Sequence, residues 1–346
     1  MSDKNNKRTP PEVATESVQF DLFKSFLTND ENEVSNAIEM WETIPKYFFT
    51  PQQVKKLRTS DGLANPFKWE FNYKGMSSAA VIQPALIEQE DGSYLAFFPS
   101  VTEELVEEAL KKILADQNHG IHDVDNVETW VRFSLRMVQR ELKARGRTRS
   151  NPEVKHAIEV MSKCNISFQQ NGKEVWNGTI LQDLVTVGRE DYLADADSHH
   201  AARLPLFITR SINKLDYRQF NYGRLMGCNQ QLSRWIYKKL IHRFKQASLT
   251  TQYHFSFSSL ANESGLLQQA SDTKNRQKVI DALDELKSCG VLYGYKIEQK
   301  KEGRAVTDVV YHVAPASEFI AEQKAANKRA SNNLENADIK GLTPPK

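Results

Sequence analysis

The chain has 346 residues, of which 40% are hydrophobic and 26% charged, so it is long enough for two or three modules with hydrophobic cores of their own. It has no run of about 20 apolar residues and no apolar stretch at its start, so we expect neither a membrane span nor a signal peptide. The three cysteines are widely spaced and form no Cys-x-x-Cys pattern, which favours a reduced, cytoplasmic setting without a zinc site; they are Cys164, Cys228 and Cys289.

The small net charge of +2 hides an uneven distribution. Residues 1–125 hold 12 basic and 21 acidic side chains, whereas residues 126–228 hold 16 and 11, and residues 229–313 hold 13 and 8. A basic body behind an acidic front region is typical of a protein that binds nucleic acid.

The first hundred residues predict a polar segment followed by a small α+β region. Residues 1–35 are polar, and we expect them to be disordered. Within residues 36–100 we expect a short helix over Asn36–Pro45 and a β-hairpin or meander over Phe67–Phe98, with a turn at Asp91-Gly92. Pro84 argues against a central strand, because proline cannot donate a hydrogen bond to a sheet ladder.

Residues 101–212 predict a first winged-helix domain. A helix over Thr102–Gln117 would begin with Thr102 as its N-cap. Further helices are expected over Val127–Arg145 and over Asn151–Cys164, with Pro152 in the first turn of the latter. A hairpin over 166–176 turns at Asn171-Gly172. The order helix, helix, hairpin is the basis of this prediction.

A basic stripe marks the predicted helix over Val127–Arg145. Arg132, Arg136 and Arg140 share a face with Lys143, opposite the apolar positions, and further arginines follow the helix end. Such a stripe can follow a phosphate backbone, although a solvated helix face is the alternative, and Glu128 next to Arg132 supports it locally. We predict phosphate contacts by Arg132, Arg136, Arg140, Arg147 and Arg149.

Residues 213–320 predict a second winged-helix domain. We expect a helix over Gln230–Gln246 with Arg234, Lys238, Lys239 and Arg243 on its outer surface. A short strand, a short helix ended by Gly265 and a longer helix over Lys274–Ser288 would follow. Strands over Val291–Glu298 and Ala305–Val313 would enclose a basic hairpin tip, the wing. We expect the remaining residues, 321–346, to form a mobile polar tail, although their Ala, Glu and Lys content could also form some helix.

The helix over Lys274–Ser288 is the predicted recognition helix. Its apolar residues share one face, and its first turns carry hydrogen-bond donors next to free backbone N–H groups, which favour anions. We predict that Asn275 and Gln277 read bases, and that Lys274, Arg276 and Lys278 contact phosphate or bases. In the wing we predict DNA contacts by Lys300, Lys301 and Arg304. Taken alone, each charged run also fits an ordinary solvated surface.

Three stretches, Leu204–Ile212, Leu215–Tyr222 and Gln231–Leu240, resemble plasmid replication initiators of the RepA/TrfA kind. The resemblance extends over roughly Val127–Phe319. It implies an α+β fold with tandem winged-helix domains that bind repeated origin sequences (iterons) in double-stranded DNA. It also implies duplex opening, recruitment of the host initiator and replicative helicase, repression of the protein's own gene, and self-dimerisation through the first winged helix. The alternative is a winged-helix transcriptional repressor without a role in replication.

A short segment near the N-terminus is similar to the pentapeptide with which some such initiators bind the bacterial sliding clamp. It reads Gln19-Phe20-Asp21-Leu22-Phe23, with Phe20 where the pattern prefers leucine. A clamp groove would take up the side chains of Leu22 and Phe23. The alternative is the start of a helix that docks Phe20, Phe23, Phe26 and Leu27 on the protein's own body.

Nothing in the chain predicts catalysis. His199 and His200 are adjacent in a polar loop, so they cannot point into one metal site from a strand. There is no Gly-x-x-x-x-Gly-Lys-Ser/Thr phosphate loop and no Gly-x-Gly-x-x-Gly motif. We therefore expect a DNA-binding protein and not an enzyme, with no cofactor and no metal.

Overall fold

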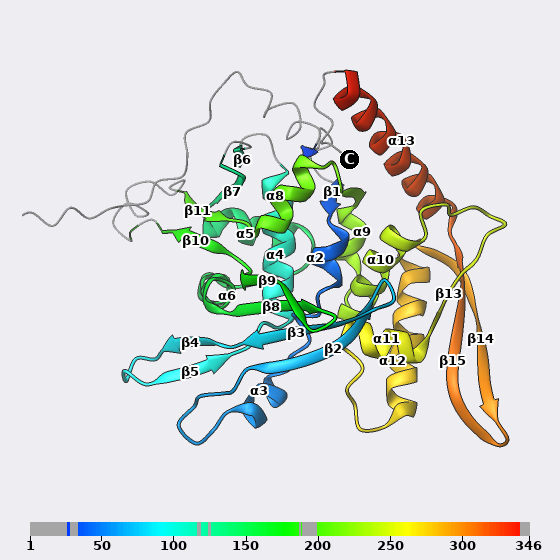
Figure 1. The fold of residues 1–346 in the computed structure, drawn as a ribbon, viewed down its shortest axis with the longest axis horizontal. Coiled ribbons are helices and arrows are strands. Elements are labelled where there is room, and N and C mark those ends of the chain that lie inside the picture. The colour runs from blue at the N-terminus through cyan, green and yellow to red at the C-terminus, as the bar shows by residue number, and fades with distance from the viewer. Residues whose placement is uncertain are drawn as a thin grey trace, which may run out of the picture.

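The structure is a computed structural model, and it describes residues 26–27, 34–115, 119–123, 126–186, 188 and 199–339. It is a mixed α/β protein with several antiparallel sheets (Figure 1). One hydrophobic core runs through it, from Phe26 near the start to Ile320 near the end. Helix α4 (Val101–Leu114) lies at its centre and is buried along almost its whole length.

The N-terminal elements are β1 (Val34–Ala37), α2 (Glu39–Thr43) and α3 (Pro51–Leu57). The helix predicted over Asn36–Pro45 is therefore shorter than expected. The residues before it pair instead, as strand β1, with the distant strand β12 (Arg218–Asn221). Asn36 is drawn into this arrangement because its side-chain amide donates to the backbone oxygen of Phe26, 2.5 Å away.

A four-stranded antiparallel sheet joins residues on both sides of the boundary predicted after residue 100. Its order is β2-β3-β8-β9, from β2 (Phe67–Tyr73), β3 (Met76–Gln83), β8 (Asn165–Gln170) and β9 (Lys173–Thr179). The predicted turn at Asn171-Gly172 is present, with both residues at positive φ. A second such turn, at Lys74-Gly75, was not predicted.

The remaining predicted hairpin of this region is a separate two-stranded ribbon. Strands β4 (Ala85–Glu88) and β5 (Tyr94–Phe97) pair with each other across the turn that contains Asp91 and Gly92. Pro84 lies between β3 and β4, outside any strand, as its missing donor predicted.

The start of α4 differs from the prediction by two residues. The N-cap is Ser100 and not Thr102, because Ser100 forms a capping box with Glu103. The Glu103 carboxylate accepts from the backbone N–H of Ser100 at 2.7 Å. Four acidic residues of α4 are buried, namely Glu103, Glu104, Glu107 and Glu108.

The helix predicted over Val127–Arg145 is wrong in its first half, which is the strand β7 (Glu128–Phe133). The strand lies in a sheet of order β10-β11-β7-β6, with β6 (Gly120–Asp123), β10 (Gln182–Val185) and β11 (His200–Arg203). Its β-branched and aromatic residues suit a strand, and Val131 and Phe133 are fully buried there. Ser134 then caps α5 (Leu135–Ala144). Helix α6 (Asn151–Lys163) follows as predicted, with Pro152 in its first turn.

After α8 (Leu206–Asn213), β12 and α9 (Tyr222–Gly227), residues 231–315 form what we call the C-terminal module. Its elements are α10 (Gln231–Arg243), β13 (Tyr253–Ser256), α11 (Phe257–Ser264), α12 (Asp272–Ser288), β14 (Leu292–Glu302) and β15 (Ala305–Pro315). The strands make an antiparallel sheet of order β13-β15-β14. This is the predicted order, and Gly265 ends α11 in the left-handed conformation as expected.

The predicted mobile tail is a helix as far as the structure describes it. Helix α13 (Ser317–Ile339) packs on β12, where Arg218 donates to Gln323 at 2.7 Å and to Asn327 at 2.9 Å. Gln323 is only 2% exposed. The expected mobility is contradicted for this packed part, where tertiary hydrogen bonds hold the helix that the Ala, Glu and Lys content permits.

Part of the segment predicted to be disordered is held by the same helix. Phe26 and Leu27 are buried, and Phe26 packs edge-on against Tyr217. The guanidinium of Arg329, in α13, donates to the backbone oxygen of Leu27 at 2.5 Å. These two residues therefore dock on the body, as the alternative interpretation of the N-terminus expected. Gln19–Phe23 lie outside the described residues.

Candidate nucleic-acid interface

The first turns of α12 and the tip of the β14–β15 hairpin lie at the same end of the molecule (Figure 1). Helix α12 is anchored by apolar residues on one face, and Val279, Leu283 and Leu286 are fully buried. This leaves the opposite face of its first turns in solvent. The structure thus brings together the two surfaces that the sequence predicted to contact DNA.

Two of the five donor-rich residues at the start of α12 are exposed to solvent. Lys274 and Gln277 lie one turn apart on the outer face. The amide of Gln277 donates to the carboxylate of Asp281 at 2.8 Å, one turn further along the helix. Gln277 keeps its carbonyl oxygen for another donor, so it can still take part in recognition.

Asn275 faces inward and is only 4% exposed. Its side-chain oxygen accepts from the backbone N–H of Gln269 at 3.0 Å, and its amide donates to the oxygen of the same residue at 2.9 Å. The oxygen and the nitrogen of the side-chain amide thus both hold the loop before α12. The prediction that Asn275 reads bases is therefore wrong. The spacing could have shown this, because Asn275 precedes the buried Val279 by one helical turn.

Lys278 also has an internal role. Its ammonium donates to the backbone oxygen of Leu266 at 2.9 Å, just beyond the end of α11, and burial lowers its pKa. Lys278 therefore binds a backbone oxygen of the protein, whereas the prediction was a contact with phosphate or bases. Arg276 is half-buried, and its guanidinium lies 5.5 Å from the centre of the Phe257 ring.

The tip of the β14–β15 hairpin is basic and exposed. Lys300, Lys301 and Arg304 are all exposed, as predicted. The two strands continue further than expected, so the turn is only Gly303-Arg304, with Gly303 at a φ of +60°. Lys296, which the sequence analysis left out, is an additional exposed cation on β14.

The predicted basic stripe in the first half of the chain is split by the fold. Arg132 is exposed on strand β7, while Arg136 and Arg140 are exposed on α5. In Figure 1, α5 lies on the other side of α4 from α12. These cations therefore form a surface separate from the start of α12.

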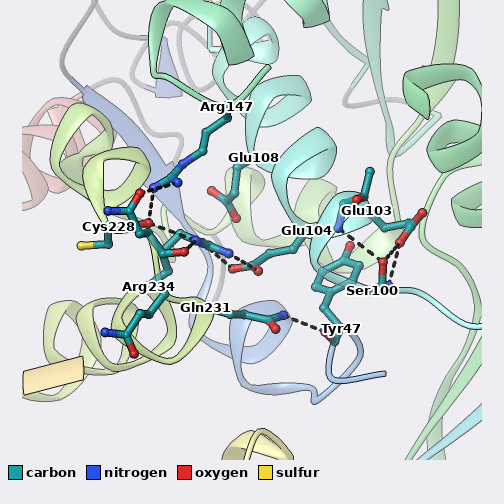
Figure 2. Close-up of polar contacts among 12 residues, drawn as sticks. Tyr47, Ser100, Glu103, Glu104, Glu108, Arg147, Cys228, Gln231 and Arg234 are labelled. Atoms are coloured by element: carbon teal, nitrogen blue, oxygen red, sulfur yellow. Dashed lines mark hydrogen bonds and ion pairs between the residues drawn. The ribbon is translucent and has the colours of Figure 1, made fainter. Parts of the chain in front are cut away.

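Arg147 turns away from this surface. Its guanidinium donates to the backbone oxygen of Met226 at 2.9 Å and 3.1 Å and to the side chain of Asn229 at 2.8 Å. Figure 2 shows it reaching the carbonyl of Cys228, and burial lowers its pKa. Arg147 joins α5 to the link between α9 and α10, a structural role in place of the predicted phosphate contact. Arg149 is half-buried, and one of its terminal nitrogens donates to the oxygen of Thr148.

The module is fixed to the rest of the protein by a buried ionic contact between α10 and α4. Arg234 is 1% exposed and donates to both carboxylate oxygens of Glu104, at 3.1 Å and 2.8 Å. It also donates to the backbone oxygens of Cys228 and Asn229, so its buried charge is compensated by one carboxylate and two carbonyl groups (Figure 2).

Lys238, one turn further along α10, makes a second such contact. Its ammonium lies 2.7 Å from Glu42 and 2.5 Å from Glu108. Arg234 and Lys238 therefore do not lie on the outer surface where the helix pattern had placed them. The acidic residues of α4 explain this, since they offer buried partners to both cations. Part of the positive charge of residues 229–313 is thus internal and cannot act on a ligand.

Neither a metal-binding group nor a membrane-spanning helix is found among the described residues. No group of three or more His, Cys, Asp or Glu side chains there could hold a metal ion. No helix in that part of the chain is long and apolar enough to cross a membrane.

Comparisons with known proteins gave likenesses of fold only. No family model matches the chain, and no curated protein matches it. Among solved structures the chain is similar to one of domains 2 and 3 of RctB, at 13% identity, covering 76% of this chain and 98% of that one, with a TM-score of 0.46. A second structure of RctB domains 2 and 3 is similar at 12% identity, covering 78% of this chain and 97% of that one, with a TM-score of 0.44. The chain is also similar to the Pi initiator protein in complex with iteron DNA, at 12% identity, covering 83% of this chain and 99% of that one, with a TM-score of 0.37.

Proposed function

We propose that the chain is a replication initiator that binds repeated origin sequences through its C-terminal module. The observation that carries the DNA-binding part is the placement of exposed donors at the start of α12 at the same end of the molecule as the basic tip of β14–β15. The order α10, β13, α11, α12, β14, β15 is that of a winged helix, in which α12 would enter the major groove. Free N–H groups at the start of α12 favour the approach of phosphates.

A similar element order occurs earlier in the chain and supports a tandem arrangement. Helix α4, strands β6 and β7, helices α5 and α6, and the hairpin β8–β9 follow the order of the C-terminal module, with β6 as an additional strand. The pairing differs, because β7 lies in another sheet and β8 also pairs with β3. We propose that this first half contributes the phosphate contacts of Arg132, Arg136 and Arg140, which requires DNA to reach a second surface.

The replication role rests on the sequence resemblance of 204–240 to plasmid initiators. With it we propose repression of the protein's own gene, recruitment of the host initiator and helicase, and dimerisation through the first winged helix. The proposed mode of action is binding and duplex opening without catalysis.

The test uses DNA that flanks the gene. A small circular DNA that carries the gene and its flanking sequence, with no other origin, should be maintained in a suitable bacterial host. Charge reversal at Lys300 and Lys301 should abolish this maintenance without lowering the melting temperature, because both side chains are exposed. If the flanking DNA holds one inverted repeat and never supports replication, whereas the protein represses the promoter, the chain is a repressor.

We also propose that Gln19–Phe23 binds the host's sliding clamp, close to residues that are fixed on the protein. Phe26 and Leu27 are held by the body, so only Lys24 and Ser25 separate Gln19–Phe23 from a fixed point. A clamp that takes up Leu22 and Phe23 would then be held close to α13, whose Arg329 binds Leu27. Pull-down of the host's purified clamp by the full chain tests this proposal.

A further inference from the structure

Arg276 is the arginine in the first turns of α12, and an aromatic ring sets its direction. It lies on the side of α12 that faces α11, whose first residue is Phe257. The guanidinium carbon stands 5.5 Å from the centre of that ring, which is within the range of a cation–π contact. Arginine stacks on aromatic faces with its plane fixed, whereas a lysine at the same place would be a mobile point charge.

The nitrogens of this guanidinium are in two different situations. Nε is buried and has no hydrogen-bond partner among the described residues. The terminal nitrogens also make no hydrogen bond or ion pair there, but they are not buried. The guanidinium carbon of Arg276 thus lies over the Phe257 ring with Nε buried, and the two terminal nitrogens are left open to solvent as a pair of donors.

The neighbouring side chains are less suited to act as a rigid donor pair. Lys274 is exposed and flexible, and the amide of Gln277 is engaged with Asp281. Asn275 and Lys278 are committed inside the module. Arg276 therefore offers the one guanidinium fork on the first turns of α12.

The planar geometry of the guanidinium favours guanine over phosphate as its acceptor in DNA. A phosphate accepts hydrogen bonds from many directions, so a flexible lysine serves it and nothing is gained from a fixed plane. Guanine presents O6 and N7 side by side in the major groove, in the plane of the base, and a guanidinium donates to both at once. Fixing the plane before binding lowers the conformational entropy lost in the complex.

We propose that Arg276 reads a guanine in the recognised DNA sequence, and that Phe257 is the residue that positions it. This inference rests on the proposed function, because it places the start of α12 in the major groove. It adds a chemical requirement on the site: one G·C pair at a position that α12 reaches.

The experiment is selection of binding sites from a randomised duplex library with the purified full chain, followed by affinity measurements on the selected duplex. Wild type should select a motif with an invariant G·C pair. Arg276→Lys, which keeps the charge, should lose the preference at that pair only and weaken binding of the selected duplex roughly 5- to 150-fold.

Two further variants serve as comparisons for Arg276→Lys. Phe257→Leu should broaden the same position, because the apolar volume remains but the stacking face is gone; a melting curve checks that it folds. Lys274→Ala should weaken all duplexes alike, flatten the salt dependence and leave the motif unchanged.

Each outcome decides the matter. If Arg276→Lys selects the wild-type motif, the guanine assignment is wrong while the proposed function stands. If Arg276→Lys or Phe257→Leu weakens binding of all sequences equally, Arg276 does not read a particular base pair and the inference fails. If the wild type selects no motif at all, the proposed DNA-binding function fails with it.

Discussion

Removal of the Arg234 side chain tests how the C-terminal module is held to the rest of the protein. Arg234 donates two hydrogen bonds to Glu104 and two to backbone oxygens, all in a buried setting. Arg234→Ala leaves the Glu104 carboxylate, itself 5% exposed, without this partner. Breaking a buried ion pair from one side costs about 3–5 kcal/mol, because an uncompensated charge remains in the interior.

The assay is urea unfolding of the full chain, with the free energy of unfolding compared between variants. Arg234→Ala and Glu104→Ala should each lower it by about 3–5 kcal/mol, and the double variant should lose much less than the sum. Replacing both residues by apolar side chains of similar size, Arg234→Met with Glu104→Leu, should recover most of the loss.

The exposed pair Lys163 and Glu159 is a matched control, since its two charges are 2.6 Å apart on the surface of α6. Lys163→Ala should cost about 0–1 kcal/mol. Effects of Arg234→Ala and Glu104→Ala that are small, or that simply add, would refute the assignment of a buried, coupled contact.

Three further predictions follow. His242 is buried and its pKa is lowered to about 4 by desolvation, so the folded protein excludes a proton that the unfolded chain binds below about pH 6.5. Stability should therefore fall as pH falls from about 6.5 toward 4, by about 2 kcal/mol between pH 7 and pH 5, and a His242→Gln variant that keeps this slope in urea unfolding would disprove the assignment. Asn275→Ala should lower the melting temperature, because the contacts with Gln269 are lost. Gln277→Ala should leave the melting temperature unchanged and weaken cognate DNA binding by about 1–3 kcal/mol. Calorimetry measures the first effect and DNA titration the second, and equal melting temperatures of the two variants would count against the inward placement of Asn275. Leu22→Ala with Phe23→Ala should abolish clamp pull-down without changing stability, whereas a lowered melting temperature and no clamp binding by the wild type would show that the segment belongs to the core.

The C-terminal module could be predicted from the sequence because each of its elements has a clear local pattern. Gly265 marks a helix end by its backbone conformation, and Val279, Leu283 and Leu286 repeat at helical spacing. The hairpin strands are rich in β-branched residues. Local signals of this kind need no knowledge of distant contacts, so the order of elements emerged correctly.

The stretch from 127 to 145 failed because its apolar residues fit two periods at once. Trp130, Val131 and Leu135 match a helical face, but Val131 and Phe133 also match the alternation of a strand. The strand is fixed by pairing on both sides, with β6 just before it and with β11 far along the chain. Strand β6 is only four residues long and was not predicted, and the β11 partner lies outside any short window of sequence.

The candidate site was predicted as a region but not residue by residue. A sequence shows which donors lie near the start of a helix, yet Asn275, Lys278 and Arg147 proved to bind backbone oxygens inside the protein. Their partners depend on loops whose course is set by tertiary packing. Conversely, the cation–π contact between Arg276 and Phe257 joins two helices, so neither residue indicates it alone.

The most direct test of the central claim is a hydroxyl-radical footprint of the purified full chain on the DNA that flanks its gene. If the start of α12 and the tip of β14–β15 bind repeated origin sequences, protection should recur at a regular spacing of about two helical turns (~20 bp) on one face of the duplex. Gln277→Ala and the charge reversal at Lys300 and Lys301 should remove it. A single protected inverted repeat, or a repeated footprint that survives both changes, would contradict the account.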